Sequence, residues 1–514
     1  MSVAEPPRPP APAAATARPA SVPRLTARRL IERFRSRRAD WKQYGLTAGI
    51  SAALHALILG LCSLVILDQQ RMEDILTTIA TLVETENEPI VEQAPIQPEE
   101  LLDERVDSNL TTTSADQLAD LTAPANLDIN DLDPSTAITD IEVPGLANLK
   151  ISDETSGRSE AARAALVKKF GGNSASEAAV ASGLKWLAEH QLPDGSWSFD
   201  HTHAPSCRGQ CSQPGSMGEC RTGATGLALL AFLGGGHTHQ KGDYTAQVKK
   251  GLEALVKSGQ LTPEGIDLRG ELAGGNRHAA FYAQGIATIA LCEVVALTRD
   301  PRYRPIAQGA VNFIVNAQDP KGGGWRYEPR QAGDTSVVGW QVMALKSGQN
   351  ARLKVPGPVF KGAERFLDSV QADNGARYAY MDPKSPAPTT TAVGLLCRMY
   401  LGWDRKHKGL QDGIAYLDKT KPASNNMYYN YYATQVLHHW GGEEWTRWNE
   451  VMRNRLVATQ RPRGDGHLAG SWDLADPHGG AGGRHYMTCL AVMTLEVYYR
   501  HLPIYQREQL KVEY

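Results

Sequence analysis

From residue 174 onward the sequence alternates between two kinds of helical pattern. One kind is apolar nearly all round, and the other has an apolar stripe opposite a charged face. In segment 244–258, for example, Val248 and Leu252 lie on the stripe while Lys249 and Lys250 face away. The apolar segments are 222–233, 281–297, 334–345, 389–400, 428–440 and 484–499, and the striped ones are 174–191, 244–258, 304–318, 358–371, 408–418 and 445–460.

A helix that is apolar all round belongs inside a protein, and a striped helix belongs on its outside. Six consecutive outer–inner pairs therefore predict an all-α fold, an (α/α)6 toroid with a double ring of helices over residues 174–514. Each pair leaves an apolar face uncovered, so the repeats are expected to bury one continuous core together.

A recurring turn joins the two predicted rings. Four of the six striped helices end in Gln. A Gly-rich turn follows and an aromatic residue comes next, in segments 191–197, 318–325, 371–378 and, more loosely, 460–472. Gly supplies the positive φ that ends a helix, the Gln amide can bond exposed carbonyls, and the Trp ring covers the bend. These residues are expected to be structural.

The Gln-x3-Gly-x-Trp turns between helix pairs resemble the repeats of squalene–hopene cyclases, and the toroid resembles that of protein prenyltransferase β-subunits. The family motifs are degenerate. In segment 331–336, the best match to the Asp-rich motif of the cyclases, Gly333 occupies the position of the proton-donating Asp. In the best match to the prenyltransferase zinc site, Asp334 is kept, but Ser336 and Met487 replace the Cys and His.

The resemblance thus implies a terpenoid cyclase-like or prenyltransferase-like toroid that serves as an extracytoplasmic binding or scaffold module. The alternative is an isoprenoid- or lipid-acting enzyme with a rearranged central site, in which Asp334 is an acid or base and His278 and His485 lie beside it. An isoprenoid or lipid ligand is the partner expected of either. No phosphate loop, dinucleotide fingerprint or nucleophile elbow specifies a reaction class, and no nucleic-acid partner is predicted.

The starts of the inner helices collect aromatic and polar side chains, a mixture that is typical of a concave binding site. The same residues could instead cap helix ends and bond backbone carbonyls. The predicted ligand pocket consists of Arg277, Tyr282, Trp340, Tyr428, Asn430, Tyr431, Arg484 and Tyr486.

Three cysteines in a Gly- and Pro-rich stretch form the best candidate metal site. Cys207, Cys211 and Cys220, with His203 close upstream, have the ligand chemistry of Zn²⁺ or another thiophilic ion. A disulfide between two of them is an equal alternative, because the compartment predicted below permits disulfides. Unpaired thiols are the third possibility.

The first 173 residues are expected to be an anchor and a tether. Residues 1–45 have a net charge of +7, and residues 46–67 contain no Asp, Glu, Lys or Arg over 22 positions. This is long enough for a single transmembrane helix, with the basic end in the cytoplasm. The domain beyond it would then be extracytoplasmic, and periplasmic if the membrane is the inner membrane of a bacterium. Residues 68–173 are predicted to be an acidic disordered linker, since 68–157 has a net charge of −18.

The predicted span carries Ser51 and His55 on one helix face. Polar groups at that depth often meet partner helices, and the arrangement is similar to the anchors of the energy-transducing TonB family. A third hypothesis is therefore an anchored component of an energy-coupled envelope complex. The whole chain has a net charge of −2 and is 42% hydrophobic, which argues against a polytopic membrane protein.

Overall fold

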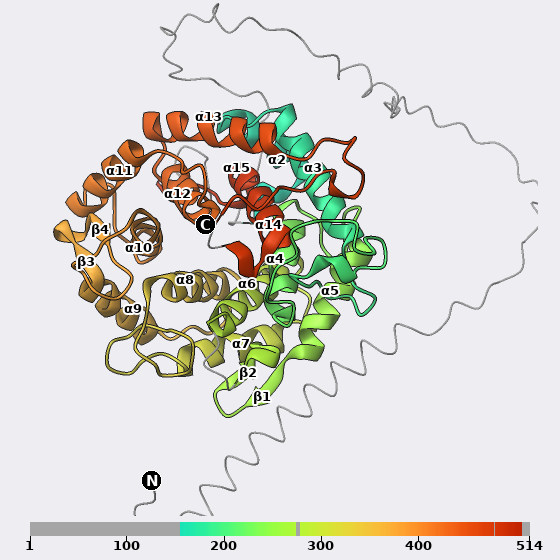
Figure 1. Ribbon diagram of the computed structural model, residues 1–514. Helices are drawn as coiled ribbons and strands as arrows, with labels where there is room; N and C mark the ends of the chain where they lie inside the picture. The colour runs from blue at the N-terminus through green and yellow to red at the C-terminus, as the bar shows by residue number, and fades with distance from the viewer. Residues whose placement is uncertain (1–154, 274–277, 477–478, 506–514) are drawn as a thin grey trace, which may run out of the picture. The chain divides into compact units, whose positions relative to one another are not determined.

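Twelve helices form two concentric rings in the computed structural model, which describes residues 155–273, 278–476 and 479–505 (Figure 1). Outer helices alternate with inner helices along the chain. The outer helices are α3 (Ser174–Glu189), α5 (Thr245–Ser258), α7 (Arg304–Asn316), α9 (Gly357–Val370), α11 (Lys408–Thr420) and α13 (Gly442–Thr459). The inner helices are α4 (Arg221–Gly234), α6 (Ala280–Thr298), α8 (Thr335–Asn350), α10 (Pro388–Tyr400), α12 (Met427–Trp440) and α14 (Gly483–Leu495).

Each inner helix packs on the next one, and α14 packs on α4, so the inner ring is closed. The outer ring closes as well, because α13 contacts α3 (Figure 1). The predicted (α/α)6 toroid is confirmed.

The core follows the two sequence patterns. Fifteen of the nineteen residues of inner helix α6 are buried, whereas outer helix α5 buries only Val248, Gly251, Leu252 and Leu255. Neighbouring inner helices approach closely where small residues meet. A methyl group on Gly226 of α4 would lie 3.0 Å from the backbone nitrogen of Ala287 on α6, so this crossing requires glycine.

The remaining elements are short. The 3₁₀ helix η3 (Ser156–Arg158) and α2 (Glu160–Lys169) precede the first pair, and α15 (Val497–Arg500) follows the last. Strand β1 (Gln260–Thr262) pairs antiparallel with β2 (Gly265–Asp267), with Gln260 opposite Asp267, and β3 (Gln371–Ala372) pairs antiparallel with β4 (Arg377–Tyr378). Five further 3₁₀ helices lie in the loops: η4 (His201–His203), η5 (Gly270–Leu272), η6 (Asp373–Gly375), η7 (Gly466–Leu468) and η8 (Gly479–Ala481).

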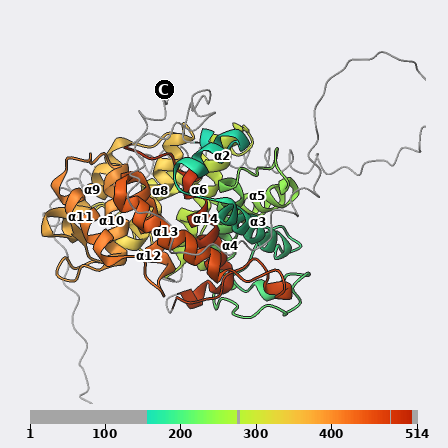
Figure 2. The same cartoon turned by 90° about the horizontal axis from the view of Figure 1, so that it is seen from above.

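The long loops that lead into α4 and α14 meet at one end of the toroid, where the green and red connections lie together in Figure 2. The amide nitrogens of Ser216 and Met217 donate to the carbonyls of Gly480 and Ala481, each at 3.1 Å. These loops are therefore joined to each other above the inner ring.

The Gln turns bond as the sequence predicts. Gln191 Nε2 donates to the carbonyl of Gly195 in its own turn at 2.7 Å and to that of Gln247 on α5 at 2.9 Å. Gln318 bonds its turn and α9 in the same way. The turn glycines have positive φ: Gly195 +83°, Gly323 +82° and Gly470 +86°. The Trp indoles donate to backbone carbonyls of the preceding outer helix: Trp197 to Leu187, Trp325 to Ile314 and Trp472 to Leu456.

Gln460 closes the outer ring. It ends α13, and its Nε2 donates to Gly470 in its own turn and to Ala179 on α3, each at 2.8 Å. One amide thus joins the last outer helix to the first.

We expect Gln460→Ala to lower the free energy of unfolding by about 2 kcal/mol, because each lost hydrogen bond contributes about 1 kcal/mol. Urea unfolding followed by circular dichroism measures the change. Gln411→Ala is the matched control, since Gln411 is exposed on α11 and its side-chain amide donates to one carbonyl only. Equal losses in the two variants would contradict a ring-closing role for Gln460.

The predicted basic segment, transmembrane span and acidic linker lie outside the described residues, so these features and the roles of Ser51 and His55 stay predictions. Within the described part, α6 alone is long and apolar enough to cross a membrane. However, 83% of its most apolar window is buried in the toroid, which is what its place in the inner ring requires.

Candidate functional site

A cavity of about 720 Å³ lies where the inner helices begin. All six inner helices border it with residues in or next to their first turns, and the loops that precede α4, α6, α10 and α14 complete the wall. Its lining comprises Phe199, Met217, Cys220, Gly223, Leu227, His278, Ala279, Tyr282, Ala283, Ile286, Ser336, Trp340, Tyr380, Thr389, Asn426, Tyr428, Gly479, Ala481, Gly482 and Tyr486.

Six of the twenty lining residues are Phe, Tyr or Trp. Trp340 lies beside Tyr428, with ring centroids 6.5 Å apart, and Tyr428 packs on Tyr432 at 5.0 Å. Among the described residues the lining contains no Asp, Glu, Lys or Arg. The cavity therefore offers flat apolar surfaces together with phenol hydroxyls, which suits an uncharged ligand.

The predicted acid Asp334 lies next to this wall but does not line it. It is the N-cap of α8, where its Oδ1 accepts a hydrogen bond from the amide of Val337 at 2.9 Å, and it is fully buried. Burial raises the pKa of Asp334 to about 6, although the Val337 amide, the Tyr380 hydroxyl and Arg326 oppose the rise. Its first role is thus to begin the helix.

The three predicted catalytic residues lie on different elements: Asp334 at the start of α8, His278 in the loop before α6 and His485 on α14. His278 is exposed at the cavity, with its ring stacked on Tyr327 at 4.5 Å. His485 is buried on α14, across the inner ring from α8, and its Nε2 lies 3.0 Å from the carbonyl oxygen of Ala224. Burial lowers the pKa of His485 to about 4, so it is neutral near pH 7.

Four of the predicted pocket residues line the cavity: Tyr282, Trp340, Tyr428 and Tyr486. Arg277 lies outside the described residues. The remaining three face elsewhere. The Asn430 amide bonds the backbone of Ala423, and Arg484 is buried among loop acceptors. Tyr431 lies behind Trp340, with the two rings stacked at 5.9 Å, and it borders a second cavity together with Arg500.

Arg484 holds the two loops above the ring together. Its guanidinium donates to Ser212 and Gln213 in one loop and to Ser471 and Asp473 in the other. Its side chain is fully buried, so these acceptors take the place of water. The role of Arg484 is structural.

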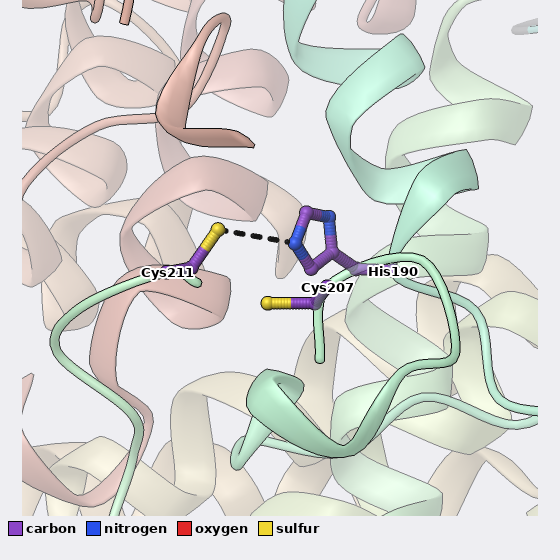
Figure 3. Close-up of side chains that lie close together, drawn as sticks. All are labelled: His190, Cys207 and Cys211. Carbon is purple, nitrogen blue, oxygen red and sulfur yellow. Dashed lines mark hydrogen bonds between the residues drawn. The ribbon is translucent and has the colours of Figure 1, made fainter. Parts of the chain in front are cut away.

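The predicted metal residues divide between two places. Cys207 and Cys211 lie together beside His190, a residue that the sequence did not single out (Figure 3). Cys220 instead lines the cavity, and the side chain of His203 is 73% exposed, with Asp200 3.6 Å away. All six cysteines in the described part of the chain are free thiols.

Sequence reasoning missed the loop residues of the cavity, chiefly Phe199, Met217 and Tyr380. Helical periodicity carries no information on how loops fold over a ring. The aromatic residues close to the Gly-rich turns, Phe199 after the first turn and Tyr380 after the third, were the available signal.

No family model and no curated protein matches this sequence. Three solved structures show a similar toroid. They are an alpha-1,6-mannanase from Salegentibacter sp. (11% identity, TM-score 0.43, 63% of this chain and 98% of that one), cellobiose 2-epimerase from Bacillus thermoamylovorans (14%, 0.44, 65% and 99%) and an alpha-amylase from Clostridium perfringens (10%, 0.42, 62% and 97%).

These findings correct the family interpretation. The similar structures are carbohydrate-active toroids, so the assignment to the squalene–hopene cyclase and prenyltransferase superfamily is wrong. The cyclase-like module with degenerate motifs and the terpenoid cyclase or prenyltransferase activity are wrong with it. The Gln–Gly–Trp turn is not specific to that superfamily. Any stacked helix pair needs a turn that ends one helix, bonds its exposed carbonyls and covers the bend. At these identities the similarity describes the fold alone.

Proposed function

We propose that the toroid binds a neutral saccharide in the cavity at the starts of the inner helices. The aromatic, uncharged lining of this cavity carries the proposal. The volume of about 720 Å³ is within the range of small-molecule sites and accommodates a short oligosaccharide.

A sugar ring has an apolar face of C–H groups and an edge of hydroxyls. Trp340, which is buried, and Tyr428, which is half-buried, provide aromatic surface against which such a face packs. The hydroxyl of Tyr380 bonds that of Tyr327 at 2.6 Å, which orients one polar group at the wall. Ser336, Thr389 and Asn426 add uncharged hydrogen-bonding groups.

The lining favours binding without hydrolysis. Cleavage of a glycosidic bond ordinarily requires two carboxyl groups flanking the bond. Among the described lining residues there is none, and the nearby Asp334 caps α8 behind the wall.

Calorimetric titration of the full-length chain with neutral di- and trisaccharides of glucose and mannose tests this function. We expect saturable binding by at least one of them. Tyr428→Ala should weaken that binding at least about fivefold, because one aromatic stack contributes about 1 kcal/mol beyond its buried area.

Tyr416→Ala is the matched control, since Tyr416 is half-buried on outer helix α11 and away from the cavity. Binding should be unchanged in this variant. Absence of binding to every sugar tested, or undiminished binding by Tyr428→Ala, would contradict the proposal.

A further inference from the structure

The loop between α3 and α4 brings two thiols and an imidazole together. His190 is the C-cap of α3, and Cys207 and Cys211 lie in the loop that follows. All three side chains are buried, and their ligand atoms lie within 4.8 Å of one another. Figure 3 shows the Cys211 sulfur facing a ring nitrogen of His190, with the Cys207 sulfur beside them.

The orientation of His190 leaves the correct nitrogen for a metal. Its Nδ1 lies 2.7 Å from the carbonyl oxygen of Trp186, to which only a protonated nitrogen can donate. Nε2 therefore carries the lone pair, and it lies 3.3 Å from Cys211 Sγ. The Trp186 indole stacks on the imidazole at 3.9 Å and holds its plane. A backbone carbonyl behind the imidazole is the usual support of a metal-binding histidine.

We propose that His190, Cys207 and Cys211 bind a thiophilic metal ion, with Zn²⁺ the expected one. A tetrahedral zinc has bonds of about 2.3 Å to sulfur and about 2.0 Å to nitrogen, which places its ligand atoms roughly 3.5–3.8 Å apart. His190 Nε2 and Cys211 Sγ are 3.3 Å apart and all three ligand atoms lie within 4.8 Å of one another, so movements of about 1 Å or less reach this spacing. Binding displaces the protons of both thiols, so two thiolates neutralise the ion.

His201 is the candidate for the fourth ligand. Its ring centroid lies 5.6 Å from that of His190, and its side chain is 1% exposed. Neither of its ring nitrogens makes a hydrogen bond of standard geometry with a described residue, although the backbone of Phe199 lies close to one of them. A neutral buried imidazole has one nitrogen with a lone pair, and a metal ion can bind that lone pair.

The site would act as a structural clamp at the cavity. The loop that contains both cysteines also supplies Phe199, Met217 and Cys220 to the cavity wall. A metal that ties Cys207 and Cys211 to the end of α3 fixes this wall whatever ligand the cavity holds, so the inference does not depend on the proposed saccharide.

Titration of the reduced, chelator-stripped full-length chain with Co²⁺ tests the site. We expect one equivalent to bind and to give the near-ultraviolet absorption of sulfur-to-cobalt charge transfer, and Zn²⁺ to displace it. Cys207→Ser and Cys211→Ser should each abolish this absorption. Cys220→Ser is the matched control and should retain it, because Cys220 is a buried thiol of the same loop outside the group.

X-ray absorption at the zinc edge of the zinc-loaded wild type tests the ligands directly and does not depend on whether the variants fold. Two sulfur ligands with imidazole nitrogen support the site, and coordination without sulfur overturns it. The absence of stoichiometric binding, or cobalt absorption that survives in Cys207→Ser, also overturns it. So does a Cys207–Cys211 disulfide found by peptide mapping of chain purified without reductant.

Discussion

Glu293→Ala should lower the free energy of unfolding by about 3–5 kcal/mol, the usual cost of removing one partner from a buried ion pair. Glu293 lies on inner helix α6, where Arg158 Nη1 donates to its Oε2 at 2.7 Å and Arg500 Nη2 to its Oε1 at 2.9 Å. Both arginines are buried, so the variant removes the carboxylate of Arg158 and leaves Arg500 with only Glu496, at 3.6 Å.

The position of this cluster in the fold makes the loss large. Arg158 comes from η3 before the first helix pair, and Arg500 comes from α15 after the last. Arg158 also donates to the carbonyl of Leu233, and Arg500 to that of Leu230, near the end of α4. Glu293 thus holds both ends of the described chain against the inner ring.

Urea unfolding of the wild type and of Glu293→Ala measures the effect. Glu443→Ala is the matched control, because the side chain of Glu443 on α13 is 88% exposed and pairs with Arg447 at the surface. Surface pairs contribute less than about 1 kcal/mol, so the control should stay close to wild type. If Glu293→Ala lowers the free energy of unfolding by less than about 1 kcal/mol, as a surface pair would, the cluster does not hold the chain ends.

The fold was predictable because the two helix types differ in the burial they need. The apolar pattern of 222–233 became α4, Arg221–Gly234, with an error of one residue at each end. The pattern of 484–499 was predicted as one helix but divides into α14 and α15 around Glu496. The apolar periodicity of the sequence continues through Glu496, so the periodicity could not predict where the helix breaks. The β1–β2 hairpin was not predicted, since each strand has only three residues.

The cavity was only partly predictable. Tyr282, Trp340 and Tyr428 line it because helix starts converge at one end of a closed ring. Asn430 and Arg484 also lie in first turns, but their side chains donate to acceptors in neighbouring loops, which the sequence does not reveal. Which way such a residue faces depends on loops folded over the ring.

The thiol cluster shows the same limit. Cys207 and Cys211 were singled out by residue type, but spacing along the chain suggested Cys220 as their companion. The loop instead turns back to the end of α3, where His190 lies. A histidine at the end of a striped helix has no local feature that distinguishes it, so only the tertiary path of the loop identifies it.

The difference in stability between Glu496→Gln and the wild type should grow by about 1.4 kcal/mol per pH unit from pH 4.5 to pH 8. Burial raises the pKa of Glu496 to about 8, and Arg500 only partly opposes the rise. The same arginine acts differently on Glu293. Burial also raises the pKa of Glu293, but Arg158 and Arg500 hydrogen-bond both its oxygens and hold the pKa below its ordinary value.

Glu496 lies 3.6 Å from Arg500, and both its oxygens are buried without a hydrogen bond of standard geometry to a described residue. The folded state therefore holds the proton that the unfolded chain releases above pH 4.5. The contribution of Glu496 is fully present below that pH and is lost as the pH rises toward 8, by roughly 4–5 kcal/mol in all. Glu496→Gln cannot ionise and removes this dependence.

Urea midpoints of both proteins at pH 5, 6, 7 and 8, all within that window, measure the slope. Glu443→Gln is the matched control, because the side chain of Glu443 is exposed in the folded state. The difference in stability between this variant and the wild type should not grow with pH in the same way. If the difference between Glu496→Gln and wild type stays constant across the four conditions, Glu496 is ionised in the folded protein. The attraction of Arg500 and its neighbours would then outweigh desolvation at this carboxyl, as it does at Glu293.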